Sequence, residues 1–271
     1  MDEAHVALTD LEAAGYQIEF HSHALAIMKL DFPTLLDELE SALVNLTIPI
    51  QEIIGSGGGE SKGTQRLRRS LAEQGWKKVN FSIEKRINGV VRESQSHEVD
   101  HVRELARPID IGPPVLNDVQ RIALEIEWNN KDPFFDRDLE NFKRLHAEGA
   151  ISAGVIVTRG ASLQSELKQL VLQFAAEQKL EDLEDLTLLG LTPTPRQKQE
   201  ITKRVDRGAS FAEAWSGQFV QDKYGAATTH WSKLQDRVHR GVGNPCPLVL
   251  VGLPAEIVTF DGLAADSTDE A

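Results

Sequence analysis

The sequence is poor in cysteine, in long apolar runs and in basic residues. Cys246 is the only cysteine among 271 residues, which excludes a disulfide within the chain and a zinc site built from several cysteines. No apolar run approaches the roughly 18 residues that a membrane-spanning helix needs. Residues 1–14 are acidic and carry no signal-peptide pattern. We therefore expect a cytoplasmic protein that has no contact with a membrane.

Charge is one-sided, because 42 acidic residues outnumber 29 basic ones and give a net charge of −13. This balance argues against a nucleic-acid partner, which usually needs a basic surface. Two stretches nevertheless carry a local basic excess, with eight basic and two acidic residues in 61–88 and nine and five in 191–245. We predict that both stretches face phosphates, with ordinary solvated helix faces as the alternative. The candidate contacts are Lys62, Arg66, Arg69, Lys203, Arg204 and Arg207.

Residues 121–128 place two carboxylates inside an otherwise apolar segment. Glu125 and Glu127 alternate with apolar residues, which is the period of two expected for a strand with one face in a core. Both glutamates therefore leave the same face, and their like charges need a counter-charge, a shared proton or a metal cation. We favour a divalent cation; a solvated edge strand is the alternative. The apolar positions are Ile122, Leu124, Ile126 and Trp128.

The residues that follow predict a turn and then a helix. Residues 129–133, NNKDP, are a dense run of turn formers. Apolar residues then recur at every third position from Leu139 to Leu145, which predicts a helix over 136–145. The acid pair is thus expected at the end of a strand, directly before a polar turn.

Other segments show alternating strand and helix patterns. Residues 78–87 and 90–102 are predicted to form two strands joined by a tight turn at Asn88-Gly89. The apolar run 151–158 is typical of a buried strand. This succession predicts an α/β fold with a mixed central β-sheet flanked by helices. The remaining predictions are strands at 15–20 and 247–253, helices at 31–44, 62–74 and 163–174, and a mostly helical region at 193–240.

Residues 125–139, EIEWNNKDPFFDRDL, resemble the active-site segment of BglII-type restriction endonucleases. That family belongs to the PD-(D/E)xK nuclease superfamily, in which BglII and BamHI relatives replace the usual lysine after the second acid by glutamate or glutamine. The Glu-x-Glu form of this chain is similar to that branch. Further similarity extends from residues 57–62 through 75–76 and over 96–100 and 154–159, so the resemblance covers most of the region from about residue 20 to 160.

The resemblance implies a set of site residues and a cofactor. Asp100 and Glu125 would hold one or two Mg²⁺ ions, and Glu127, in the place of the usual lysine, would orient a water or bind a second metal. Asp110 and Asp118 compete with Asp100, which we prefer because it lies in a strand-like context. Glu60 and Lys131 are possible additional members of the site.

The activity implied by the resemblance is that of a type II restriction endonuclease. Its substrate would be double-stranded DNA, cut at a palindromic site by a homodimer in a bacterial or archaeal cytoplasm, and a cognate DNA methyltransferase would protect the host. A non-catalytic DNA-binding protein on a nuclease fold and a metal-dependent phosphoesterase of another substrate are the alternatives. We expect one domain over residues 1–260, with a catalytic core at about 50–175, a helical DNA-recognition or dimerisation part at about 190–245, and an acidic disordered tail at 261–271.

Overall fold

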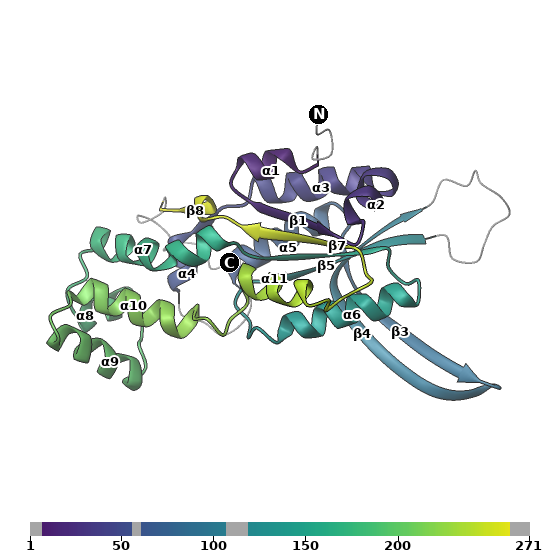
Figure 1. Ribbon diagram of the computed structural model, residues 1–271. Helices are drawn as coiled ribbons and strands as arrows, with labels where there is room; N and C mark the ends of the chain where they lie inside the picture. Colours follow the sequence, from purple (N-terminus) through teal and green to yellow (C-terminus); the bar gives the residue numbers. More distant parts are fainter. Residues whose placement is uncertain (1–6, 56–60, 107–118, 261–271) are drawn as a thin grey trace, which may run out of the picture.

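A six-stranded mixed sheet runs through the centre of the computed structural model (Figure 1), which describes residues 7–55, 61–106 and 119–260. Its strands lie in the order β1-β7-β6-β5-β4-β3. Neighbours among β5, β6 and β7 are parallel, whereas β1, β4 and β3 run antiparallel to the strands beside them. The predicted mixed α/β class is therefore confirmed. The bounds are β1 Gln17–His21, β3 Lys77–Ile87, β4 Val90–Ala106, β5 Val119–Glu127, β6 Ala153–Arg159 and β7 Leu248–Leu253.

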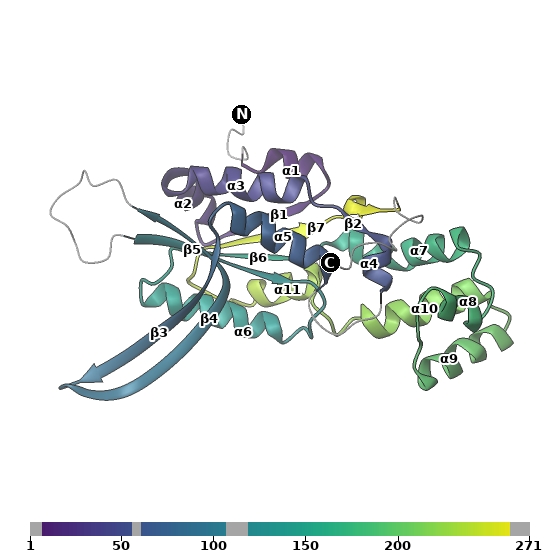
Figure 2. The same cartoon turned by 180° about the vertical axis from the view of Figure 1, so that it is seen from behind.

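Helices cover both faces of this sheet. Helices α1, α3 and α5 lie over one face and α6 and α11 over the other (Figures 1 and 2). A short parallel pair, β2 with β8, lies outside the main sheet. The helices on or beside the first face are α1 Thr9–Ala13, α2 Ala24–Asp31, α3 Pro33–Val44, α4 Ile50–Ile54 and α5 Lys62–Glu73. The remaining elements are β2 Ile48–Pro49, α6 Phe134–Ala147, α7 Ala161–Glu177, α8 Leu183–Leu188, α9 Pro195–Asp206, α10 Phe211–Lys223, α11 Trp231–His239, η2 Ala255–Ile257 and β8 Val258–Thr259.

Strand β5 is buried on both of its faces. Leu124 packs into the core beneath the first helical layer, and Ala123 packs into a second core with Phe142 of α6. Helix α6 approaches the sheet so closely that a Cβ on Gly154 would stand 2.3 Å from the Phe142 ring. The prediction of only one core face was therefore wrong, because a central strand between two helical layers loses its solvated face. The glutamates of β5 point into a packed interior.

Most predicted elements are present, with shifted boundaries. The hairpin of β3 and β4 turns at Asn88-Gly89, where both residues have positive φ (51° and 79°). The helix predicted over 31–44 is present as α3 but begins at Pro33, because proline lacks the backbone N–H needed to continue α2, which ends at Asp31. Strand β4 continues to Ala106, which shortens the predicted loop 103–120. The strand over 247–253 is confirmed as β7, but η2 and β8 follow it.

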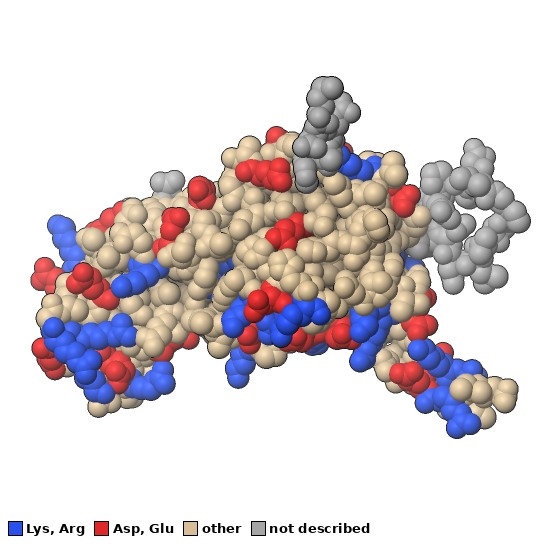
Figure 3. Space-filling view, viewed as in Figure 1, with Lys and Arg blue, Asp and Glu red and all other residues tan. Residues whose placement is uncertain are grey.

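Two parts of the molecule extend beyond the central layers. Helices α8, α9 and α10 lie at one end, and the β3–β4 ribbon projects from the other, with α6 between them in both views (Figures 1 and 2). Basic side chains gather on both extensions (Figure 3). Among the helices of the described residues, none is long and apolar enough to cross a membrane.

Candidate functional site

Glu125 and Glu127 end strand β5 on the face covered by α6. They retain only 7% and 3% of their surface exposed. Their backbone position is fixed from the next strand, since the Thr158 hydroxyl donates to the carbonyl of Glu127 at 2.7 Å. The buried Arg159 guanidinium donates to the carbonyl of Trp128 at 2.8 Å. The end of β5 is thus held rigidly, as a site built on a strand requires.

Each glutamate has few polar partners. Glu125 Oε1 accepts from the backbone N–H of Asp100 at 3.3 Å. Glu127 Oε2 accepts from the Asn130 side-chain amide at 2.8 Å, and Glu127 Oε1 lies 3.6 Å from Nη2 of Arg137. One partly exposed guanidinium is thus the positive charge beside Glu127, and among the described residues Glu125 has only a backbone donor, which is too little to offset two charges in a buried position.

Asp138 of α6 joins this cluster, although the sequence analysis did not identify it. It is buried, its Oδ1 lies 2.8 Å from Nη2 of Arg137, and its Oδ2 has no hydrogen-bond partner. A signal for it exists in the sequence: Phe135, Asp138, Phe142 and Leu145 follow one another at helical spacing, so a carboxylate occupies the apolar stripe of α6. A buried charge in such a stripe usually has a specific partner.

All three carboxyl groups have a pKa raised above its ordinary value. Burial, then the charges of Asp138 and Asp100, raises the pKa of Glu125 from 4.5 to about 9. Burial and Asp138 raise the pKa of Glu127 to about 8. The pKa of Asp138 is also raised, chiefly by burial. The cluster therefore favours bound protons or a bound cation at neutral pH.

Asp100 stands beside Glu125 but faces solvent. The register pairs His101 of β4 with Leu124 of β5, which brings Asp100 next to Glu125. Its carboxylate lies 3.3 Å from Nζ of Lys78, and its side chain is 54% exposed. Asp100 is therefore turned toward Lys78 and must rotate to meet the buried carboxylates.

The donors of this cluster fit Mg²⁺, which prefers oxygen ligands and keeps several waters. The unpartnered Oδ2 of Asp138 offers such an oxygen there. The ligand atoms of the acidic cluster are more widely spaced than those of a compact group elsewhere. Within the described ranges, the His, Cys, Asp or Glu side chains that form a group of three with all ligand atoms within 4.8 Å of one another are Glu19, His21 and His239.

Four further residues were predicted to belong to the site or to compete for a place in it. Three of them, Glu60, Asp110 and Asp118, lie outside the described residues. Lys131 is exposed, and its backbone bridges to Thr228 opposite. Its role, like those of Asp100, Glu125 and Glu127, stays a prediction.

The predicted DNA contacts divide between two distant helices. Helix α5 packs through Leu67 into the core on the face of the sheet opposite the glutamates. Its Arg66 is held by Glu52 at 2.5 Å and by the carbonyl of Thr47 at 2.7 Å, whereas Lys62 and Arg69 are exposed. On and beside α9, Lys203 pairs with Glu200, Arg204 donates to Gln221, and Arg207 is exposed.

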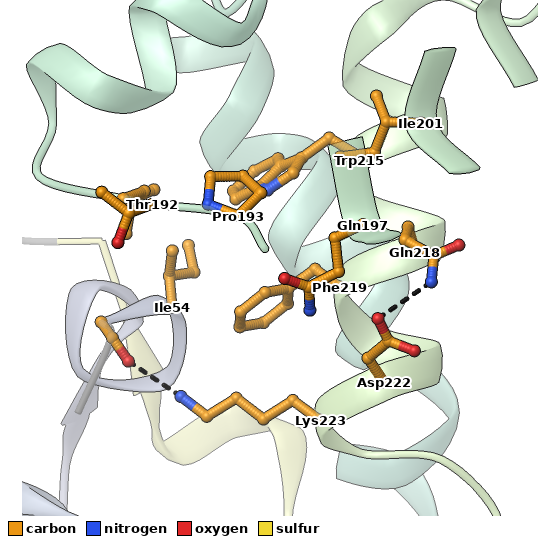
Figure 4. Close-up of a pocket in the computed structure, with 12 residues that line it drawn as sticks. Ile54, Thr192, Pro193, Gln197, Ile201, Trp215, Gln218, Phe219, Asp222 and Lys223 are labelled. Carbon is orange, nitrogen blue, oxygen red and sulfur yellow. Dashed lines mark hydrogen bonds between the residues drawn. The ribbon is translucent and has the colours of Figure 1, made fainter. Parts of the chain in front are cut away.

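A separate cavity lies between α4, α9 and α10 (Figure 4). Its volume is about 320 Å³, and its lining includes Trp215, Phe219 and Pro193. Lys223 at its rim donates to the carbonyls of Ile53 and Gly55, both at 2.9 Å. None of the clustered carboxylates lines it, so it is not part of the acidic site.

The mixed sheet, with acidic side chains at the end of a central strand, is consistent with a restriction-endonuclease-like fold. The family model described as restriction endonuclease BglII/BglIII matches residues 16–253. The chain therefore belongs to this family, and the resemblance is confirmed. Membership implies a nuclease that acts on DNA, and the family generally uses a divalent metal. A comparison with curated proteins gives no match.

Proposed function

We propose that this protein is a type II restriction endonuclease that hydrolyses phosphodiester bonds at a specific palindromic site in double-stranded DNA, with Mg²⁺. The main support is the buried cluster of Glu125, Glu127 and Asp138 beside Asp100, which is short of positive charge. Residues 1–260 act as one domain in the cytoplasm, and a cognate DNA methyltransferase protects the host DNA. The tail at 261–271 lies outside the described residues.

In this proposal each side chain has a distinct task. Asp100 and Glu125 hold one or two metal ions, whose chemistry is to lower the pKa of water and to offset charge on the leaving oxygen. Glu127 orients the attacking water and can accept its proton once a bound cation has displaced the proton that Glu127 holds in the metal-free cluster, where its pKa is about 8. Arg137, released from Glu127 and Asp138, is free to face the scissile phosphate.

The proposal is tested with supercoiled plasmid DNA incubated with protein in Mg²⁺ and, in parallel, in EDTA. Discrete fragments in Mg²⁺ alone are expected, and sequencing of their ends gives the recognition site. A nicked smear would instead indicate cleavage without sequence specificity, and intact plasmid under all conditions would indicate a non-catalytic DNA-binding protein.

Asp138→Asn should change the pH dependence of cleavage as well as its rate. Removing the Asp138 charge lowers the pKa of Glu125 and Glu127, so the rising limb of the pH–rate profile should move to lower pH. The maximal rate should fall by about 10- to 100-fold, as for the loss of a supporting group at a metal site. Single-turnover cleavage from about pH 6 to about pH 9 measures both effects.

The matched control is Asp136→Asn on the same helix. Asp136 is half-exposed and pairs with Arg237 of α11 at 2.9 Å. The pH–rate profile of Asp136→Asn should keep the wild-type shape. An unshifted profile for Asp138→Asn would mean that Asp138 is only a packing residue.

The α9 side of the molecule is proposed to contact DNA more closely than α5. Figure 3 shows basic side chains near α9, while α5 lies across the sheet from the glutamates. Lys203→Ala with Arg207→Ala should weaken binding to all sequences alike and reduce the salt slope by about 2. Lys62→Ala with Arg69→Ala should change the slope less. Equal slopes for the two double variants, measured by fluorescence anisotropy, would contradict this assignment.

We also propose that the protein is a symmetric homodimer on its site. Two chains related by a twofold axis place two scissile phosphates symmetrically on a palindrome. Helix α5, turned away from the glutamates, remains a candidate for the interface. Light scattering on cognate duplex should give the mass of two chains plus one duplex, whereas a monomer both free and on DNA would exclude this arrangement.

A further inference from the structure

A second metal-ligand cluster lies at the opposite edge of the central sheet from the β3–β4 ribbon. Glu19 and His21 leave the same face of the edge strand β1, and His239 ends helix α11. The ligand atoms of these three side chains all lie within 4.8 Å of one another. His21 Nε2 is 2.9 Å from Glu19 Oε2, and the rings of His21 and His239 are 6.0 Å apart. Residues about 220 positions apart in the chain thus converge on one point.

The distances between these ligand atoms are close to the distances between ligand atoms around a bound Zn²⁺ ion. Two ligands of a tetrahedral Zn²⁺, each at about 2.0–2.1 Å, stand about 3.4 Å apart. The cluster therefore needs shifts of only about 1 Å to close around zinc. All three side chains retain exposed surface, so little backbone movement is required.

A supporting residue already orients the carboxylate. The Gln235 amide donates to Glu19 Oε1 at 2.5 Å, which leaves Oε2 facing His21. Gln235 lies four residues before His239, so both side chains leave the same face of α11 toward β1. Fixed outer partners of this kind are characteristic of metal ligands.

The donor set selects a different metal from that of the acidic cluster. Two imidazole nitrogens and one carboxylate oxygen suit Zn²⁺, whereas an all-oxygen set suits Mg²⁺. A hollow of about 440 Å³, whose lining includes Glu19 and His21, gives access from solvent. Water can occupy the fourth position, as in zinc sites with three protein ligands.

We propose that Glu19, His21 and His239 form a zinc site, separate from the catalytic metal, that ties edge strand β1 to helix α11. Strand β1 is paired on one side only, with β7. Helix α11 packs against α6, which carries Asp138. Zinc at this position stabilises the native state by preferential binding and supports the layer that covers the acidic cluster.

The test compares wild type with the single variant His239→Gln and the double variant His21→Gln/His239→Gln. His239 is exposed, so the single substitution should leave folding intact. His23→Gln is the matched control, because His23 is a neighbouring histidine outside the cluster. Each protein is titrated with Zn²⁺ and with Co²⁺ in excess Mg²⁺, which saturates the oxygen site. Zinc binding is followed by calorimetry, Co²⁺ binding by visible absorption, and unfolding by a thermal scan.

Wild type and His23→Gln should bind one Zn²⁺ per chain, give a nitrogen-ligated Co²⁺ spectrum, and unfold about 5 °C or more higher at a 100-fold excess of zinc over its Kd. His239→Gln should lose more than about 100-fold in affinity, beyond the effect of losing a supporting group alone. The double variant should give no Co²⁺ spectrum and still cleave DNA in Mg²⁺. Equal stoichiometry and spectra in wild type and the double variant would overturn the proposal, whatever their nuclease activity.

Discussion

Replacing Glu125 with glutamine should give a folded protein that no longer cleaves DNA and that, without metal, is more stable than the wild type. The glutamate is buried beside Asp138 and Asp100, and its ionised form is unfavourable there. Glutamine keeps the volume of the side chain and removes the charge. Cleavage is lost because the amide is a much poorer ligand for a hard cation than a carboxylate.

The gain in stability should depend on pH in a defined direction. Glu125 has a pKa of about 9 in the folded protein and an ordinary value of 4.5 when unfolded. The folded state therefore binds more protons than the unfolded state between these values, and the stability of the wild type falls as pH rises through this window. The free energy of unfolding of Glu125→Gln should exceed that of the wild type by an amount that grows from about pH 5 to about pH 9. At pH 7 this difference should be at most about 3 kcal/mol.

Urea unfolding in EDTA at several pH values measures this difference, and plasmid cleavage in Mg²⁺ measures the activity. Glu140→Gln is the control: Glu140 is a partly exposed α6 residue paired with Lys143, and its loss should alter neither property. A constant stability difference across the pH range would contradict the raised pKa of Glu125.

Asp100→Ala separates the catalytic role from the effect of burial. Asp100 is 54% exposed, so its removal should change stability little while cleavage is lost. Cleavage at the wild-type rate by a folded Asp100→Ala protein would exclude Asp100 as the metal-binding aspartate. The role would then move to Asp110 or Asp118, which lie outside the described residues.

Local patterns predicted the strand and the same-face placement of Glu125 and Glu127, because alternation has a fixed geometric meaning in a strand. The Asn88-Gly89 turn was predicted because few residues tolerate its positive φ. Asp138 was missed because its importance arises only when α6 packs against β5. Local sequence patterns also could not predict that α5 lies on the face of the sheet opposite the glutamates, since a helix with one apolar side can pack on either face.

The same limit explains why the zinc ligands were not anticipated. Glu19 and His21 are close in sequence. His239 joins them only because β1 pairs with β7 and because α11 lies over one face of the sheet that these strands form. A chain with one cysteine gives no spacing signal for such a site. Ligands contributed by a strand and a distant helix become visible only in the fold.

DNA binding should tighten strongly when calcium replaces EDTA. Calcium takes oxygen ligands as magnesium does, and here it serves as a non-catalytic substitute. When they are ionised, Asp100, Glu125, Glu127 and Asp138 place negative charge where the proposed site would hold the scissile phosphate, and a bound cation reverses the sign of that interaction. Fluorescence anisotropy on cognate duplex, with EDTA or calcium, measures the difference.

The effect should also increase with pH. With EDTA, Glu125 and Glu127 are largely protonated at pH 7, since their pKa values are about 9 and about 8. Raising the pH through this range ionises both groups, so binding should weaken. In saturating calcium the protons are already displaced, and affinity should change little with pH. In either buffer, monovalent salt should weaken binding steeply, because counterion release contributes to it.

Glu125→Ala tests whether this dependence belongs to the acidic cluster. The variant should bind more tightly than wild type in EDTA near pH 9 and should gain less from calcium, because it has lost both a repulsive charge and a ligand. Lys203→Ala, which removes one basic residue of α9, should weaken binding in both buffers by the same factor. Equal wild-type affinity in EDTA and calcium at every pH would mean that these carboxylates do not face the phosphate. The proposed active site would then lose its main physical support.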